Sequence, residues 1–285
     1  MKARAVLKLI PVLIPSLAIL LFYIWPLGDS VIRSFQAFNG DFVGFQNYID
    51  MLNDSMFVDA FTYTLKVTLV VLIVTTVSST ILAMALRGTF IGKRIVLFLL
   101  QFDISIPSLA CATMMILALS PFGFLSTLAE NAGIISNYTQ FPNILLDTNG
   151  TGLMVAIIWL FVPYTALSFL SVLKSVSNEQ EEQAATLGVG KFSRFIHITL
   201  PSLKPSIAYM SILCFASVFS AFELPSLIGK QHTLVTLAYY YYNRPGFMDG
   251  YMESYAIVTV TSLISIIVSF ILMYYSLTAE ERRSD

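Results

Sequence analysis

The sequence contains few charged residues. They make up 12% of the 285 residues, and the formal net charge is −1, whereas soluble domains carry roughly a quarter charged residues. A chain so close to neutral lacks the basic excess that nucleic-acid-binding proteins use, so we expect no nucleic-acid partner. Hydrophobic residues make up 56% of the chain, which indicates a membrane protein and predicts a lipid bilayer as its surroundings.

Catalytic and metal-binding motifs are also absent from the sequence. It has no phosphate-binding loop of the G-x-x-x-x-G-K-[ST] kind and no H-E-x-x-H motif. Its two histidines, His197 and His232, are far apart, and its two cysteines, Cys111 and Cys214, fall in apolar segments as small packing residues. We therefore predict no catalytic residue, no metal site and no cofactor-binding site in this chain.

Six apolar segments of about twenty residues or more are long enough to cross a hydrocarbon core of roughly 30 Å. Because unpaired backbone groups cannot lie in lipid, we predict that all six are helices of a single transmembrane domain spanning residues 1–285. No small-residue cleavage site follows the first segment, so we expect it to be retained. The segments are Val6 to Leu27, Ala60 to Leu86, Ile95 to Leu119, Leu153 to Leu173, Ile207 to Leu227, and Tyr255 to Tyr275.

Lysine and arginine are concentrated on one side of these spans. The N-terminus, the connections 87–94 and 174–204, and the C-terminal tail hold twelve of the sixteen cations. Under the positive-inside rule, this distribution predicts a multi-pass protein of the cell membrane with both termini in the cytoplasm.

A polar helix is predicted between the fourth and fifth spans, from Ser177 to Gly188, on the cytoplasmic side. Ser177 and Gln180 form a capping box, and Gly188 supplies the left-handed residue that ends a helix. Its alanines leave a face with little side-chain bulk, which lets another protein approach the backbone closely. We interpret this helix as a docking element, with Glu181, Glu182, Ala184 and Ala185 as its characteristic residues.

With Ile198, Leu200 and Pro201 further along, this segment resembles the signature loop of ABC-importer permeases, in which Glu-Ala-Ala is followed by Gly and then Ile-x-Leu-Pro. The segments Phe42 to Tyr48 and Ser220 to Leu224 resemble carbohydrate-importer permeases of the maltose-permease type. The resemblance covers nearly the whole chain. It implies that residues 174–204 form the ATPase-coupling loop, with Glu181, Glu182, Ala184, Ala185, Gly188, Ile198, Leu200 and Pro201 as its contact residues.

The resemblance also implies an activity and its partners. The chain would be the membrane-spanning permease subunit of an ATP-driven importer in a prokaryotic cell membrane, moving a sugar or oligosaccharide by alternating access. Its partners would be a second permease subunit, two copies of an ATPase subunit that hold ATP and Mg²⁺, and an extracytoplasmic solute-binding protein. Two alternatives stay open: a permease for another solute class, such as acidic sugars or short peptides, and a membrane scaffold or enzyme without transport activity.

Three ionisable residues lie within the predicted spans and are candidates for a translocation pathway. A charge in a bilayer costs several kcal/mol, so Lys66, Asp103 and Glu223 are expected to face a bundle interior or a water-filled cavity. Lys66 can instead extend to the membrane surface, and Asp103 can instead satisfy backbone groups freed by Pro107. We favour Glu223 as the pathway residue.

Aromatic residues complete the candidate pathway. Phe222 adjoins the favoured carboxylate, and Tyr239 and Tyr240 begin a run of four tyrosines. The run can also form an interfacial aromatic belt. Four consecutive tyrosines cannot all face one way, so part of the run should face protein or a cavity.

Overall fold

The computed structural model describes residues 15–145, 147–175, 183–244 and 248–284. Within these residues, six helical stretches are long and apolar enough to cross a membrane, which confirms the predicted all-helical, six-span fold. They are Pro15–Arg33, Ser55–Arg87, Ser108–Asn131, Thr151–Ser175, Lys191–Phe219 and Gly250–Tyr274.

The described residues divide into two compact units. The first unit combines the chain up to Ala60 with Leu234–Leu263, and the second combines Phe61–Thr233 with the chain from Ile264. Whether both belong to one transmembrane domain stays a prediction.

The described residues of the first unit are mostly helical, with a non-helical connection at residues 34–45. Its elements are the π-helical turn η1 (Leu20–Ile24), α2 (Trp25–Arg33), α3 (Gln46–Asn53), the start of α4 (Ser55–Arg87), α13 (Leu234–Asn243) and the first part of α14 (Met248–Ser284).

The first span continues beyond its predicted end at Leu27 and reaches Arg33. Pro26 lies at the start of α2, directly after the wide turn η1. Proline cannot donate to the carbonyl four residues earlier, and its ring collides with that carbonyl in a regular helix. A π-turn relieves the collision, so the helix passes through the proline.

Asn47 fixes the connection between α2 and α3. Its side-chain amide donates to the carbonyls of Ser34 and Gln36, both at 2.9 Å, and the Tyr48 hydroxyl lies 2.6 Å from the Ser34 hydroxyl. Gln36 also pairs with Phe42 in an isolated β-bridge. One amide thus holds the beginning of the connection against the start of α3.

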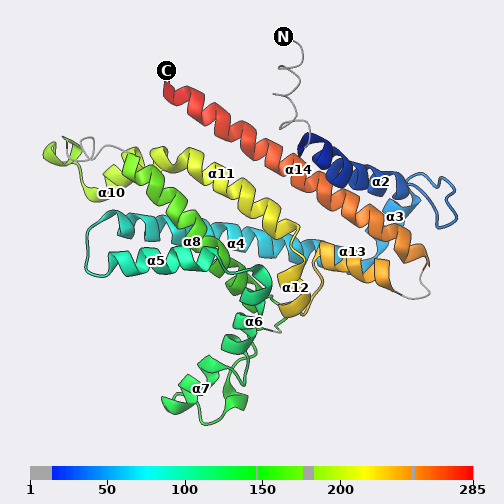
Figure 1. Ribbon diagram of the computed structural model, residues 1–285, viewed down its shortest axis with the longest axis horizontal. Coiled ribbons are helices and arrows are strands. Elements are labelled where there is room, and N and C mark those ends of the chain that lie inside the picture. Colours follow the sequence, from blue (N-terminus) through cyan, green and yellow to red (C-terminus); the bar gives the residue numbers. More distant parts are fainter. Residues whose placement is uncertain (1–14, 146, 176–182, 245–247, 285) are drawn as a thin grey trace, which may run out of the picture. The chain divides into compact units, whose positions relative to one another are not determined.

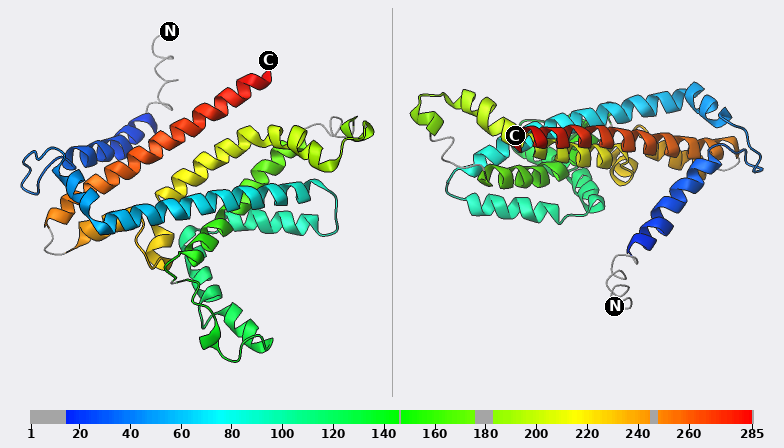
Figure 2. Two further views of the ribbon diagram at one scale, coloured as in Figure 1. Left: turned by 180° about the vertical axis from the view of Figure 1, so that it is seen from behind. Right: turned by 90° about the horizontal axis from the view of Figure 1, so that it is seen from above.

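The second unit is a bundle of helices around α8 (Thr151–Ser175). α8 contacts α5 (Lys93–Ile104), α6 (Ser108–Leu119), α11 (Leu200–Phe219) and α12 (Glu223–Ile228), and Figure 1 shows α8 alongside α11. α5 runs back along the α4 residues of this unit (Figure 2). The remaining elements are α7 (Phe124–Asn131), η2 (Tyr138–Gln140), α10 (Lys191–Arg194), η3 (Phe195–Thr199) and the last part of α14.

Two buried clusters stabilise the second unit at different levels of α8. One surrounds Ala156 and includes Cys111 and Cys214, so both cysteines are packing residues, as predicted. The other surrounds Phe169 and includes Leu203. Both clusters contain residues of α4, α8 and α11, and they hold these three helices together.

The third predicted span, Ile95 to Leu119, is two helices and not one. α5 ends at Ile104 and α6 begins at Ser108. Pro107 causes the interruption, because it cannot continue the hydrogen-bond ladder of α5. α5 is only about 18 Å long and therefore too short to cross the bilayer. The stretch able to do so is Ser108–Asn131.

The other span limits change less. α4 begins at Ser55, ahead of the predicted Ala60, because the Asp54 carboxylate accepts from the Met56 N–H at 2.9 Å and caps the helix. α8 and α14 extend beyond the predicted spans at both ends, and α14 runs from Met248 to Ser284.

Gly150 sits at a close contact that we expect to be sensitive to substitution. Its φ is +77°, and an added Cβ would meet the ring and hydroxyl of the buried Tyr63. Gly133 has a similar φ of +72°, but nothing lies within 4 Å of the Cβ position. Gly150→Ala should therefore lower stability by about 1–3 kcal/mol more than Gly133→Ala, since only the first is overpacked.

Thermal unfolding of the purified variants in detergent measures this difference. Adding Tyr63→Phe to Gly150→Ala should recover part of the loss, because the hydroxyl is the nearest atom to the new methyl group. Equal unfolding temperatures for the two alanine variants would show that Tyr63 does not restrict this turn.

Candidate functional site

The fifth predicted span, Ile207 to Leu227, is interrupted. α11 ends at Phe219, residues 220–222 leave the helical path, and α12 begins at Glu223. Pro225 explains the break, because it has no N–H for the carbonyl four residues earlier and its ring collides with that carbonyl. In the first turn of a new helix, proline is tolerated, since those N–H groups have no partner within the helix. Glu223 therefore lies at a helix start.

A cavity of about 370 Å³, here called the Glu223 cavity, lies at this break. The Glu223 carboxylate accepts a hydrogen bond from the hydroxyl of Ser108, the first residue of α6 after the Pro107 interruption. Two helix breaks caused by prolines therefore place two polar side chains together. The other lining residues come from α8, α11, α12 and the connection between the last two: Ile157, Leu160, Phe161, Ser217, Val218, Ala221, Phe222 and Leu224.

The Glu223 cavity suits a small hydroxylated ligand. Its described lining has one carboxylate, two serine hydroxyls and no lysine or arginine. Glu223 lies in the first turn of α12, where backbone N–H groups favour a negative charge. Its carboxylate can accept hydrogen bonds from ligand hydroxyls, while the Phe161 and Phe222 rings cover apolar faces. The volume is at the lower end of the range for ligand pockets.

Asp103 is buried near the end of α5, with 7% of its surface exposed. Its carboxylate oxygens accept no hydrogen bond of good geometry among the described residues, although Trp159 on α8 and Cys111 on α6 lie within electrostatic range. The alternative that Asp103 satisfies backbone groups freed by Pro107 is therefore wrong for the described residues. Asp103 does not line the Glu223 cavity, so its pathway role stays a prediction.

Lys66 is exposed on α4, and its ammonium donates to the Asn149 side chain at 3.1 Å. This contact links α4 to the connection that precedes α8. Lys66 is not among the lining residues of the Glu223 cavity, and its pathway role also stays a prediction.

The tyrosine run lies on α13 in the first unit. Tyr239 and Tyr240 are 57% and 37% exposed, whereas Tyr241 is 4% exposed and its hydroxyl donates to the Asp54 carboxylate. Burial, together with this hydrogen bond, raises the pKa of Tyr241 above its usual range. The expectation that the tyrosines face different ways is confirmed. A pathway role for Tyr239 and Tyr240 stays a prediction.

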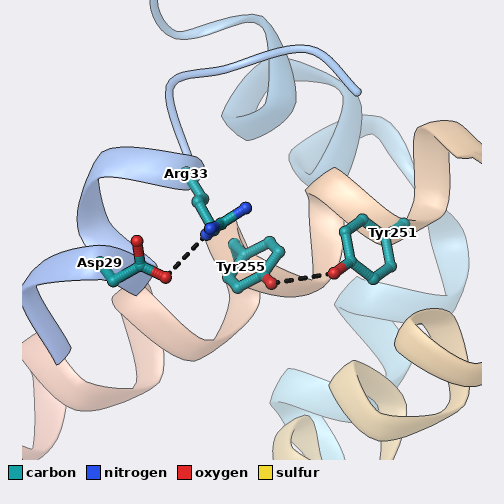
Figure 3. Close-up of polar contacts among 4 residues, drawn as sticks. All are labelled: Asp29, Arg33, Tyr251 and Tyr255. Atoms are coloured by element: carbon teal, nitrogen blue, oxygen red, sulfur yellow. Dashed lines mark hydrogen bonds and ion pairs between the residues drawn. The ribbon is translucent and has the colours of Figure 1, made fainter. Parts of the chain in front are cut away.

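Sequence reasoning missed a polar cluster between the first and last spans of the first unit (Figure 3). Arg33 donates to the Asp29 carboxylate at 2.7 Å, and its guanidinium lies 5.9 Å from the centre of the Tyr255 ring. The Tyr255 and Tyr251 hydroxyls are 3.1 Å apart. Both pairs have the i, i+4 spacing that places side chains together on a helix. The sequence could therefore predict each pair, but not the contact between Arg33 and Tyr255 that joins the two pairs.

The structure describes the predicted docking helix only from residue 183 onward. Its predicted end at Gly188 is confirmed. Gly188 has a φ of +80°. Its N–H donates to the Ala185 carbonyl at 3.0 Å, and the Val189 N–H donates to the Ala184 carbonyl at 2.9 Å. These two bonds form a Schellman motif, which requires a left-handed residue at this position.

The start of this helix lies outside the described residues. The predicted capping box of Ser177 and Gln180 falls there, and so do the candidate contact residues Glu181 and Glu182. Their roles stay predictions.

The second half of the predicted coupling loop is helical from Lys191 on and is continuous with the helix of the fifth candidate span. Ile198 lies in the π-turn η3, and Leu200 and Pro201 begin α11. The wide turn accommodates Pro201 in the same way as η1 accommodates Pro26. The helical stretch that contains these residues begins at Lys191, and the predicted loop end at residue 204 stays a prediction.

Comparisons with known proteins support an assignment of this architecture. The permease protein UgpA of the sn-glycerol-3-phosphate transport system from Shigella dysenteriae is 25% identical over 274 residues, covering 91% of this chain and 90% of the relative. The probable ABC transporter permease protein YurN of Bacillus subtilis is 25% identical over 295 residues, covering 96% and 98%.

A solved structure has the same fold. A chain of a bacterial ABC transporter involved in the import of the acidic polysaccharide alginate superposes with a TM-score of 0.77 at 16% identity, covering 97% of each chain. The family model of the binding-protein-dependent transport system inner membrane component matches residues 76–279, which is more than half of the chain. The chain therefore belongs to this family of multi-pass inner-membrane transport components.

Proposed function

We propose that the chain is a permease subunit of an ATP-driven ABC importer for a carbohydrate, and that the Glu223 cavity is part of its translocation pathway. The proposed partners are a second permease subunit, two ATPase subunits that bind ATP and Mg²⁺, and a solute-binding protein. The names of the relatives support a polyhydroxylated solute, since sn-glycerol 3-phosphate and alginate both carry several hydroxyl groups, although both are also acidic. The ATPase activity would belong to the partner, which leaves this chain without a catalytic role.

One structural observation carries the mechanism. The helical stretch Lys191–Phe219 begins just after Gly188 and ends at the Glu223 cavity, where Ser217 and Val218 form part of the lining. A helix of this length spans about 43 Å. Displacement of the docking helix by an ATPase can therefore be transmitted along one continuous element to the cavity, which is what rocking between inward-facing and outward-facing states requires.

The charge of the Glu223 cavity favours a neutral solute over an acidic one. A ligand carboxylate or phosphate would lie near the Glu223 carboxylate without a lysine or arginine among the lining residues, and like charges at close range repel. The lining alone therefore favours a neutral solute, whereas the solutes named for the relatives, sn-glycerol 3-phosphate and alginate, are both acidic, so the alternative of an acidic-sugar permease stays open.

The proposed orientation gives a topology prediction. We propose that both termini and the docking helix face the cytoplasm, supported by the twelve of sixteen cations on that side. A reporter fused after Lys191 or after the C-terminus should report the cytoplasm, and a reporter within residues 137–149 should report the outside. A periplasmic signal after Lys191 would contradict the scheme, because no ATPase could then reach the docking helix.

Co-purification separates the transport proposal from a membrane scaffold or enzyme. Mild-detergent extraction of the tagged chain from its native membrane should recover an ATPase subunit and a second permease. If the chain is recovered without any nucleotide-hydrolysing partner under conditions that preserve other importers, the scaffold alternative gains support.

A further inference from the structure

A second pocket, here called the basic pocket, lies at the other end of α8 and α11 from the Glu223 cavity. It has a volume of about 370 Å³. Three cations contribute to its lining: Arg87 at the end of α4, and Lys191 and Arg194 on α10. The other lining residues are Met84, Gly88, Leu173, Phe195 and Thr199. No acidic residue is among the described lining residues.

The basic pocket lies where three candidate membrane-crossing helices begin or end. α4 ends at Arg87, α8 ends at Ser175, and the stretch Lys191–Phe219 begins at Lys191. On this basis we place the cations near the membrane boundary, and Met84, Leu173 and Phe195 give the same pocket an apolar side. This arrangement is amphipathic in the same sense as a phospholipid, with a charged end next to an apolar one.

We propose that the basic pocket binds a phosphate group, and that the phosphate belongs to the headgroup of an anionic phospholipid. Arginine and lysine are the side chains that bind phosphate oxygens, and basic pockets between membrane helices attract anionic headgroups. Arg87 and Arg194 make further interactions, so the proposal rests on the three-cation excess and the placement of the pocket, not on unpaired groups. It is independent of which solute is transported.

A bound headgroup would connect elements that are far apart in the sequence. Arg87 precedes the α4–α5 connection, whereas Lys191 and Arg194 follow the docking helix and begin the helical stretch that reaches the Glu223 cavity. The lipid would then stabilise the start of that stretch against the end of α4. The expected consequence is a protein whose stability depends on anionic lipid.

Thermal unfolding of the full-length chain, purified with the partner subunits that accompany it, tests the proposal. Phosphatidylglycerol, phosphatidylcholine and inorganic phosphate are titrated separately at constant ionic strength. Phosphatidylglycerol should raise the unfolding temperature in a saturable way, whereas phosphatidylcholine should not. Each cation near a membrane surface contributes about fivefold to anionic-lipid affinity, so Lys191→Gln should weaken the effect about fivefold and Arg87→Gln with Lys191→Gln about thirtyfold.

Lys204→Gln is the matched control, because Lys204 is an exposed cation on α11 outside the lining of the basic pocket. It should leave the phosphatidylglycerol effect within about twofold of the original. If inorganic phosphate protects the protein and the double substitution removes this protection, the basic pocket is a phosphate site for a soluble compound, and its assignment to a lipid is overturned. Equal protection by both lipids, or an equal loss in Lys204→Gln, would overturn the proposal.

Retention of lipid gives a second readout if the double variant folds poorly. Mass spectrometry of the purified protein should find less co-purified phosphatidylglycerol in Lys191→Gln than in Lys204→Gln. Lys191 is exposed on the short helix α10, so its substitution leaves the buried clusters intact. Equal lipid content in the two variants would count against the basic pocket as a lipid site.

Discussion

Substitution of Glu223 by glutamine is expected to reduce solute affinity at the membrane step by about ten- to a hundredfold. A hydrogen bond from a solute hydroxyl to a charged acceptor contributes about 1.5–3 kcal/mol of binding free energy, and replacement of the carboxylate by a neutral amide loses most of that contribution. Glu223→Gln keeps the size of the side chain and its place at the start of α12. The measurement is solute-dependent uptake by the assembled complex, with the solute concentration varied to obtain the apparent affinity.

Glu130→Gln is the control for this experiment. Glu130 is exposed at the end of α7, in the same unit, and is not a lining residue of the Glu223 cavity. It should transport normally. Ser108→Ala should have a smaller effect than Glu223→Gln, because it removes a neutral donor from the carboxylate and leaves the charge. If uptake is unchanged in Glu223→Gln while its unfolding temperature falls, Glu223 links helices and does not bind solute.

Substitution of Gly188 by valine is expected to lower transport and solute-stimulated ATP hydrolysis by about five- to thirtyfold. The residue has a φ of +80°, and the left-handed conformation costs roughly 1–2 kcal/mol for a residue with a Cβ, which changes a population by that factor. The Schellman motif that ends the docking helix would be disfavoured, so the ATPase would contact a displaced helix end.

Gly190→Val provides the matched comparison. Gly190 has an ordinary φ of −63°, and nothing lies within 4 Å of its Cβ position. The same side chain two residues away should therefore leave coupling close to normal, and both variants should insert into the membrane. Equal losses in the two variants would show that bulk near the loop, and not the left-handed turn, determines coupling.

Hydrophobic length was sufficient to predict the six membrane helices, because a span needs little more than about twenty apolar residues. It was insufficient for their interruptions. Pro107 and Pro225 lie in apolar surroundings that read as continuous spans, and the structure breaks the helix near both. Pro163 lies within α8 without ending it. A proline alone therefore does not decide between a break and a continuous helix, because packing around it contributes.

The candidate site was predicted in part for the same reason. Glu223 and Phe222 were identified from a charge and a ring within an apolar segment, and both line the cavity. Ser108 was missed, because a serine in an apolar span has no distinctive sequence signal. Its meeting with Glu223 depends on two helix breaks that lie 115 residues apart in the chain. Local patterns carry no information on such a long-range contact.

Gly188 shows the converse case. A glycine that follows a polar helix predicts a left-handed end from local chemistry alone, and the structure has that end. The basic pocket could not be predicted in this way, because Arg87 and Lys191 come together only when α4 and the fifth span are packed.

Reconstitution tests the central proposal most directly. Vesicles are prepared with the co-purified ATPase, the second permease and the solute-binding protein, with or without this chain, and accumulation of a labelled neutral sugar is followed with ATP present. We expect ATP-dependent accumulation that requires this chain and falls in Glu223→Gln. Accumulation that persists without the chain would contradict the proposed role, and accumulation of an acidic solute but not of a neutral one would contradict the proposed solute preference.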